Sequence, residues 1–299
     1  MWTRTAITIA VLVYLSVIGL TLVFPELDFK LMLLVIGLVF LGMPHGALDI
    51  YLTYKLIKKG QRISTFLGAY LLISAGVIAL WTINPTVSFL CFLAYSMFHF
   101  ADSDLQKPIG LNRVTWLEFG ARFPLPLGLP ILFHENSTVS LISLVHPLIQ
   151  FEPFIPYFKF LGAVGLVLTT LFTLFGGFYF FKKSDRRDLT FLEPAVLCVL
   201  FSQITPLYAL GIYFCFIHSI KHLVNVVTHL NLKSFTRLIP FWLAPLAGVP
   251  ILFAIYVFGG YRADEFQAHL FQYVIVILSA LALPHALLVR YCKITGTID

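Results

Sequence analysis

The stretch Thr65–Ile83, TFLGAYLLISAGVIALWTI, contains no charged residue in 19 positions. An α-helix needs about 20 such residues to cross the hydrocarbon core of a bilayer. The whole chain is 59% hydrophobic and only 11% charged, whereas soluble domains are about 45–50% apolar. The sequence therefore predicts an all-α, polytopic integral membrane protein, with most of its length used by helices.

Other apolar runs predict the remaining membrane helices. Besides 65–83, we expect firm spans at 6–24, 31–50, 86–103, 157–181, 207–230, 239–258 and 271–289. Two weaker segments, 119–134 and 190–205, contain prolines and charged residues, and 139–151 is too short to span. Proline removes a backbone donor, so broken or re-entrant helices are expected there. The prediction is a single membrane-embedded domain, residues 1–299, with about 8–10 transmembrane helices.

The positive residues predict the orientation of the chain. The net charge is +6, and Lys and Arg cluster in short connections such as 55–62 and 182–187. Such clusters mark the cytoplasmic side of a membrane protein, so we do not expect a nucleic-acid partner. Placing both clusters inside puts the N and C termini in the cytoplasm as well. The four cysteines form no Cys-x-x-Cys pair and imply no disulfide framework. We expect a multi-pass protein of the inner or plasma membrane.

Four histidines lie within these apolar runs: His45, His99, His218 and His222. Hydrocarbon contains no water to solvate an imidazole, so an intramembrane histidine needs a partner and is a candidate functional residue. His218 and His222 are four residues apart, so a helix presents both rings on one face, as a chelating pair requires. In the predicted topology these four and His285 lie near the cytoplasmic ends of their helices and can line one cavity.

This combination of side chains suits a metal. Several neutral imidazoles without thiolate, in a cavity that admits a ligand, suit iron-based oxygen chemistry. A ligating histidine usually donates its other N–H to a carboxylate or carbonyl. Same-face spacing favours Asp49, four residues after His45, and Asp102, three after His99, over Asp104. The alternative for each histidine is a hydrogen bond that only joins neighbouring helices.

Aromatic residues are abundant, with 30 phenylalanines and 13 tyrosines. Aromatic faces stack well on polyenes, although most such residues face lipid or lie in interfacial belts. Those close to the histidines in sequence are candidates for the wall of a tunnel for a long conjugated or isoprenoid lipid: Tyr95, Phe98, Phe100, Tyr213, Phe214 and Phe216.

Four motifs together are similar to a known family. They are GMPHGALD (Gly42–Asp49), HFADSD (His99–Asp104), HSIKHL (His218–Leu223) and PHALLV (Pro284–Val289). In this order, over nearly the whole chain, they resemble the Brp/Blh family of bacterial and archaeal membrane β-carotene 15,15′-dioxygenases. The elements Pro-His-Gly-Ala-x-Asp and His-Ser-x-x-His are specific in combination, whereas either alone is weak.

The resemblance implies an all-helical membrane enzyme that uses Fe(II) and O2 to cleave the central double bond of β-carotene into two all-trans-retinal. The retinal would then serve a rhodopsin. It also implies that the four histidines hold the iron and that Asp49 and Asp104 are the family's acidic positions. Since spacing favours Asp102 and the resemblance favours Asp104, both stay candidates for supporting the ligands. His285 is a further candidate for this supporting role. Ala101 stands where glycine is common and Arg290 ends the last motif, which leaves the choice of polyene open.

Two other functions remain as alternatives. One is a different oxygen-using membrane enzyme, such as a lipid hydroxylase or desaturase, whose two irons generally need more histidines. The other is a retinoid- or carotenoid-binding or transport protein, in which the histidines relay protons or contact the ligand. Such a protein would turn nothing over and would need no iron.

Overall fold

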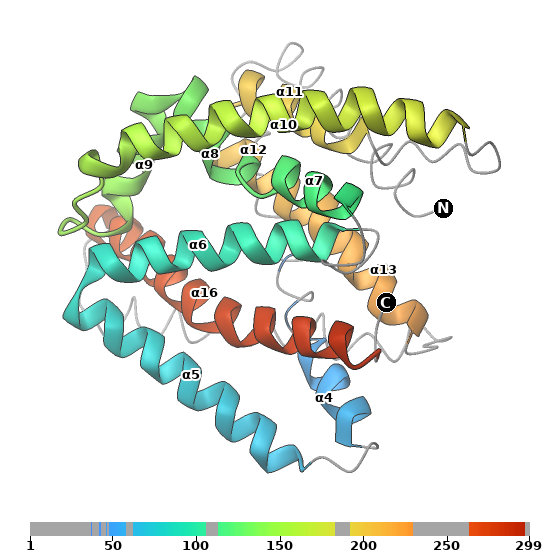
Figure 1. Ribbon diagram of the computed structural model, residues 1–299. Helices are drawn as coiled ribbons and strands as arrows, with labels where there is room; N and C mark the ends of the chain where they lie inside the picture. Colours follow the sequence, from blue (N-terminus) through green and yellow to red (C-terminus); the bar gives the residue numbers. More distant parts are fainter. Residues whose placement is uncertain are drawn as a thin grey trace. The chain divides into compact units, whose positions relative to one another are not determined.

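The computed structural model describes residues 48–57, 62–105, 113–182, 192–229 and 263–296, together with Gly37, Gly42 and Gly46. Every regular element within these residues is helical (Figure 1). Four helical segments are long and apolar enough to cross a membrane: Ile63–Ile83, Glu152–Gly176, Pro206–Val224 and Gln272–Ile294. The predicted all-α membrane fold is thus confirmed for the described residues. The spans predicted at 6–24 and 239–258, and most of 31–50, lie outside them.

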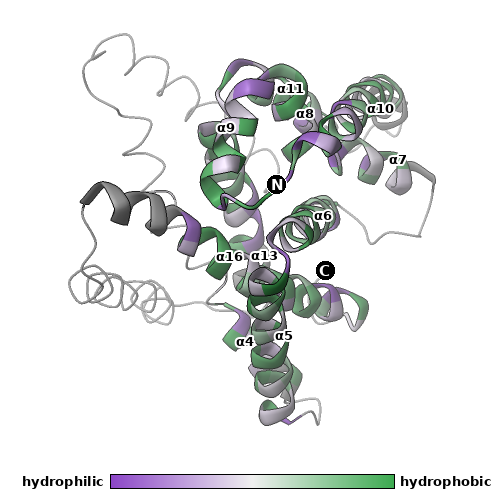
Figure 2. Cartoon of the chain, turned by 90° about the vertical axis from the view of Figure 1, so that its left-hand side faces the viewer, coloured by the Kyte–Doolittle hydropathy of each residue, from purple (hydrophilic) through white to green (hydrophobic). Residues whose placement is uncertain are grey.

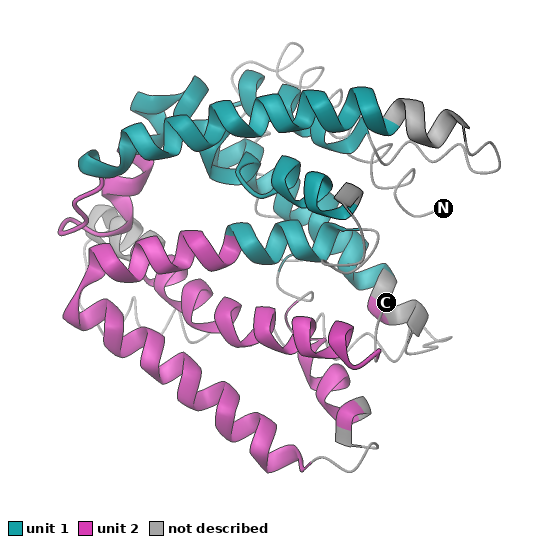
Figure 3. Ribbon diagram, viewed as in Figure 1, with its two compact units in different colours: residues 1–42, 97–139, 152–224 teal, residues 43–96, 140–151, 225–299 magenta. Residues whose placement is uncertain are grey.

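The chain forms two compact units, each assembled from three separate segments (Figure 3). Unit 1 comprises residues 1–42, 97–139 and 152–224, and unit 2 comprises 43–96, 140–151 and 225–299. Helix α6 (Pro85–Asp104) begins in unit 2 and ends in unit 1. The expectation of one membrane-embedded domain stays a prediction.

Unit 1 contains most of the shorter helices. In chain order its elements after α6 are α7 (Arg113–Arg122), α8 (Leu125–Phe133), the start of α9 (Glu135–Val145), η2 (Glu152–Phe154), α10 (Ile155–Lys182), α11 (Glu193–Gln203), α12 (Pro206–Ile212), η4 (Tyr213–His218) and the first part of α13 (Ser219–His229). The span predicted at 157–181 is confirmed as α10. The weak segment 119–134 is broken, as predicted, by a turn at Phe123 and Pro124.

Helix α8 is buried along almost its whole length and packs tightly on α10. A Cβ atom on Gly128 of α8 would lie 2.6 Å from the backbone nitrogen of Gly162 in α10. Only glycine at both positions lets the two backbones come so close. The core beside this crossing is formed by apolar side chains of α8, α11, α12 and η4: Leu125, Leu129, Leu197, Phe201, Ala209, Ile212 and Ile217. This core holds η4 against α11.

The helix predicted at 207–230 is not uniform, because η4 has π-helical hydrogen bonding between α12 and α13. The backbone N–H of Ser219 donates to the carbonyl of Phe214, five residues earlier, and Ser219 Oγ donates to the same oxygen at 2.8 Å. The wider turn inserts one extra residue just before the His218–His222 pair. Single π-turns of this kind occur frequently at functional sites.

Unit 2 is built around two long helices, α5 (Ile63–Ile83) and α16 (Ala263–Ile294), which pack together with α4 (Asp49–Ile57). Much of α5 is strongly hydrophobic (Figure 2). The helices predicted at 65–83, 86–103 and 271–289 are confirmed as α5, α6 and α16, although α16 begins eight residues earlier than expected. At the described end of the span predicted at 31–50, Leu48 lies in a turn and α4 runs from Asp49 to Ile57.

A proline inside α16 is accommodated by a side chain from α5. Pro284 has no N–H, so the carbonyl four residues before it, that of Ala280, lacks its helical donor. Ser74 Oγ donates a buried hydrogen bond of 2.9 Å to that carbonyl. Neighbouring helices commonly satisfy backbone groups that proline frees at membrane depth.

Three further polar side chains bind the same turn of α16. Tyr70 Oη donates to the carbonyl of Leu281 at 3.2 Å, and Trp81 Nε1 donates to Ser279 Oγ at 2.7 Å. The hydroxyl of Tyr95, on α6, donates to the carbonyl of Ser279. The turn of α16 that precedes Pro284 is therefore anchored by both α5 and α6.

Candidate metal and substrate site

Unit 1 gathers three of the four histidines that the sequence marks. His99 lies near the end of α6, His218 ends η4, and His222 lies one turn later in α13. Their exposed fractions are 9%, 0% and 4%, and their Nε2 atoms are buried. The ring centroids of His99 and His218 are 5.2 Å apart, with the ring planes at 76°. The structure therefore brings two histidines from distant parts of the sequence together.

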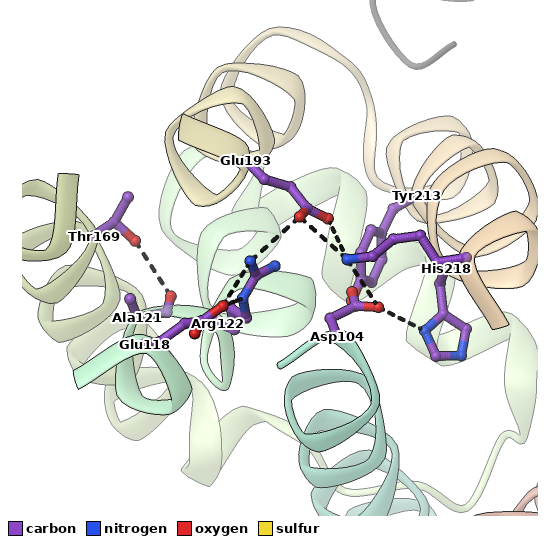
Figure 4. Close-up of polar contacts among 9 residues, drawn as sticks. Asp104, Glu118, Ala121, Arg122, Thr169, Glu193, Tyr213 and His218 are labelled. Atoms are coloured by element: carbon purple, nitrogen blue, oxygen red, sulfur yellow. Dashed lines mark hydrogen bonds and ion pairs between the residues drawn. The ribbon is translucent and has the colours of Figure 1, made fainter. Parts of the chain in front are cut away.

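A buried carboxylate, that of Asp104, contacts the Nδ1 atom of His218. Asp104 Oδ1 lies 3.4 Å from His218 Nδ1, and Asp104 Oδ2 accepts a hydrogen bond of 2.9 Å from Tyr213 Oη (Figure 4). An ionised carboxylate can only accept a hydrogen bond, so this contact favours the tautomer of His218 that has the proton on Nδ1 and the lone pair on Nε2. Same-face spacing favoured Asp102 as the partner of a histidine on its own helix, whereas Asp104 reaches across to another helix. Asp102 is buried in α6.

Unit 2 contains a second group with the same chemistry. Asp49 Oδ1 lies 2.7 Å from His285 Nδ1, and Asp49 Oδ2 lies 3.1 Å from Tyr70 Oη, whose single hydrogen is shared between this oxygen and the Leu281 carbonyl. Both Asp49 and His285 are 6% exposed. The spacing along the sequence linked Asp49 with His45, which lies outside the described residues, whereas the structure places it against His285.

The complete ligand set is not assembled by the described residues. Among them, no three His, Cys, Asp or Glu side chains come close enough together to hold a metal ion. Two of the expected ligands, His99 and His218, are neighbours, and His222 follows one helical turn after His218. Iron binding by the four histidines stays a prediction.

Three of the six candidate tunnel residues surround His218. Phe100 meets the imidazole edge-on, with centroids 4.7 Å apart, and Phe214 lies nearly parallel to it at 6.2 Å. Tyr213 packs against Phe100 at 5.3 Å, and its hydroxyl serves Asp104. These rings make the surroundings of the imidazole apolar.

The other three aromatic candidates have different contacts. The hydroxyl of Tyr95 binds the α16 backbone in unit 2, as described above. Phe98 packs against Phe119, with centroids 5.5 Å apart. Phe216 lies beside Gly37, where an added Cβ would come within 2.8 Å of its ring. A role of these residues in binding substrate stays a prediction.

Sequence reasoning missed the charged side chains that adjoin Asp104. Lys221 Nζ lies 3.4 Å from Asp104 Oδ1 and 2.8 Å from a carboxylate oxygen of Glu193, which in turn meets Arg122. Arg122 and Glu193 are among the charged residues of the two weaker predicted segments, 119–134 and 190–205. Ionisable residues inside apolar segments were the signal that could have identified them.

The chain was compared with known proteins. The family model described as β-carotene 15,15′-dioxygenase matches residues 36–293. The chain belongs to the β-carotene 15,15′-dioxygenase family. This membership confirms the resemblance drawn from the four motifs, and it confirms the prediction of an enzyme of this type, in a family that cleaves carotenoids.

Two relatives of this dioxygenase family span most of the chain. One, named β-carotene 15,15′-dioxygenase, from uncultured marine bacterium 66A03, is 28% identical over 85% of this chain and 90% of its own length. The other, named probable β-carotene 15,15′-dioxygenase Blh, from Halobacterium salinarum, is 25% identical over 86% of this chain and 83% of its own length. No solved structure matches the chain.

Proposed function

We propose that this protein cleaves β-carotene at its central 15,15′ double bond with O2, giving two molecules of all-trans-retinal, and that it requires Fe(II). The observation that carries the proposal is the buried His99–His218 pair, 5.2 Å apart, with His218 backed by Asp104, in a chain of this family. The enzyme would take β-carotene laterally from the bilayer of the cell membrane and pass retinal to a rhodopsin.

The donor chemistry of unit 1 fits iron. His99, His218 and His222 offer neutral imidazole nitrogens without thiolate, the donor type that suits iron. The carboxylate at Nδ1 of His218 is the usual support behind a ligating histidine. We propose that His45 completes the set of four. Bound there, iron would supply the activation of O2.

The protein side chains would bind and orient the polyene. Phe100 and Phe214 flank His218 and offer faces on which a conjugated chain can stack. Because neither ring provides a hydrogen-bonding group, they also keep water away from the histidines. Asp104 holds the imidazole in one orientation, which fixes the direction of its Nε2 lone pair. The bond that is cut then depends on how far the polyene extends on either side of the histidines.

The test is conversion of β-carotene in cells that make it. The native chain is expected to give retinal in the extracted pigment, and His222→Ala is expected to give none while remaining folded in the membrane. His146→Ala is the matched control, since this half-buried histidine packs beside Trp81 and is not one of the proposed ligands. Full conversion by His222→Ala would refute the ligand assignment.

Metal content separates the proposal from its alternatives. One iron per purified chain, lost in His222→Ala and kept in His146→Ala, is expected. Two irons per chain with a hydroxylated or desaturated product would favour a hydroxylase or desaturase. Tight retinal binding without iron and without turnover would favour a binding or transport protein.

A further inference from the structure

Unit 1 contains a continuous row of buried and partly buried charged side chains that ends at His218 (Figure 4). Glu193, the first residue of α11, is 1% exposed, and both of its carboxylate oxygens accept hydrogen bonds from Lys221 Nζ, at 2.8 and 3.1 Å. Lys221 Nζ also lies 3.4 Å from Asp104 Oδ1, which lies 3.4 Å from His218 Nδ1. The order is Glu193, Lys221, Asp104, His218.

At the end of this row opposite His218, Arg122 pairs with Glu193. Its Nη2 lies 3.2 Å from Glu193 Oε2, and its Nε donates to Glu118 Oε1 at 3.1 Å. Arg122 is 3% exposed. Glu193 thus sits between two cations, and its position is fixed from both sides.

Burying these charged side chains costs desolvation free energy. Ionisable side chains inside membrane proteins are rare and usually serve a function. Buried ion pairs are weak stabilisers, because well-packed apolar residues often hold helices together equally well. Five charged residues, Asp104, Glu118, Arg122, Glu193 and Lys221, therefore point to a role beyond joining α6, α7, α11 and α13.

The contacts of Lys221 suggest what that role is. An ammonium group has three N–H donors, and Lys221 has three carboxylate oxygens within 3.4 Å, two from Glu193 and one from Asp104. Glu193 therefore fixes where the positive charge stands relative to Asp104. Lys221 and His218 both face Oδ1 of Asp104, at 3.4 Å each, so the place of the ammonium group sets how this carboxylate is oriented toward Nδ1 of His218.

We propose that Glu193 and Lys221 are positioning residues, which act through Asp104 to hold His218 in the tautomer that keeps the Nε2 lone pair available. This inference rests on the proposed function, because it assigns His218 as a ligand. Both act through Asp104: Glu193 contacts Lys221, and Lys221 contacts Asp104. Together they determine the orientation and the tautomer of the His218 ring.

The first experiment measures the tautomer directly. Metal-free protein labelled with 15N-histidine is examined by NMR in detergent micelles, and the His218 signals are identified by their absence from His218→Ala. The native chain is expected to show His218 with the proton on Nδ1. Glu193→Gln is expected to shift His218 to a mixture of both tautomers. An unchanged His218 spectrum in Glu193→Gln would overturn the proposal.

The matched control is Glu135→Gln. Glu135 is also the first residue of a helix and also pairs with a lysine, Lys159, but its side chain is 38% exposed and the pair does not include Asp104. The His218 signals of Glu135→Gln are expected to match those of the native chain. If Glu193→Gln does not fold, Glu193→Asp is used, since it keeps the negative charge and only withdraws it by one methylene.

The second experiment is a double-mutant cycle on β-carotene cleavage, per folded, iron-loaded protein. Glu193→Gln is expected to lower kcat by about 10-fold or more with KM little changed, a loss typical of residues behind a ligand. In the Asp104→Asn background the same change is expected to have no further effect on kcat. An equal loss in both backgrounds, or a loss of thermal stability with kcat unchanged, would overturn the proposal. If the native chain does not cleave β-carotene, the proposed function fails, and the NMR result still decides this inference.

Discussion

Replacing Gly128 by alanine tests whether α8 and α10 cross as closely as the structure indicates. A Cβ atom at this position would lie 2.6 Å from the nitrogen and 2.7 Å from the Cα of Gly162. Both neighbours are backbone atoms, so no side chain can rotate to make room. The two helices would have to separate, and the apolar core that joins α8 to α11 and η4 would open with them.

The size of the effect follows from two opposing terms. Inserting one methyl group into a packed interior costs about 1–3 kcal/mol, and the rigid backbone here favours the upper end. Alanine gains about 0.5–1 kcal/mol over glycine inside a helix. The net loss in the free energy of unfolding is therefore about 2 kcal/mol, which is about a 30-fold change in the unfolding equilibrium.

The control is Gly76→Ala in α5. Among the described residues, no atom outside its own helix backbone and chain neighbours lies within 4 Å of a Cβ added at Gly76. Only the gain in helix propensity remains, so the free energy of unfolding should rise by about 0.5–1 kcal/mol. The two substitutions are chemically identical and are expected to act in opposite directions.

The assay is unfolding by SDS in mixed micelles, followed by circular dichroism. The midpoint should fall for Gly128→Ala and rise slightly for Gly76→Ala. Equal midpoints for the two variants would refute the close crossing of α8 and α10.

Three further predictions concern individual contacts and the metal. Ser74→Ala leaves the Ala280 carbonyl without its donor and should lower the free energy of unfolding by about 1–3 kcal/mol, measured by SDS titration, with Ser74→Thr restoring most of it. Arg122→Met leaves Glu118 and Glu193 without this cation and should cost about 3–5 kcal/mol in the same titration; a loss below 1 kcal/mol would show that the pairs are not buried as described. Removing metal from the purified protein with a chelator should abolish retinal formation, and Fe(II) but not Zn(II) should restore it; activity that survives verified removal of iron would exclude an iron-dependent reaction.

The long helices could be predicted from the sequence because hydropathy is a local property. The apolar runs at 65–83, 157–181 and 271–289 each needed only their own residues to indicate a helix, and α5, α10 and α16 match them. The break in 119–134 was also predictable, since proline at position 124 cannot continue the α7 ladder.

The π-helical turn could not be predicted in this way. Its residues, Tyr213–His218, are apolar and aromatic like those of the flanking helix, so the hydropathy pattern does not change there. Tyr213 and Ile217 belong to the core formed with α8 and α11, and such contacts between helices leave no mark on the local pattern. A spacing of four between His218 and His222 therefore predicted a shared face but not the preceding change in helical geometry.

The partners of the histidines were the least predictable part of the candidate site. Spacing along one helix suggested Asp102 for His99 and Asp49 for His45, because only residues three or four apart can be related without a fold. The structure adds contacts that spacing could not indicate: Asp104 meets His218, 114 residues away, and Asp49 meets His285, 236 residues away. Contacts between helices depend on how the helices pack, which no single run of sequence contains.

The anchoring of the α16 turn before Pro284 has a consequence for how α5 and α16 are aligned along their length. Purely apolar helices can slide along each other at little cost, because one lipid-like surface replaces another. Here Ser74 and Trp81 of α5 each hydrogen-bond one particular atom of Ser279–Ala280, and Tyr70 shares its hydroxyl hydrogen between Leu281 and Asp49. A slide of one helical turn, about 5.4 Å, would break all three hydrogen bonds together. The two helices therefore have one alignment along their length. This alignment keeps His285, one turn further along α16, in contact with Asp49.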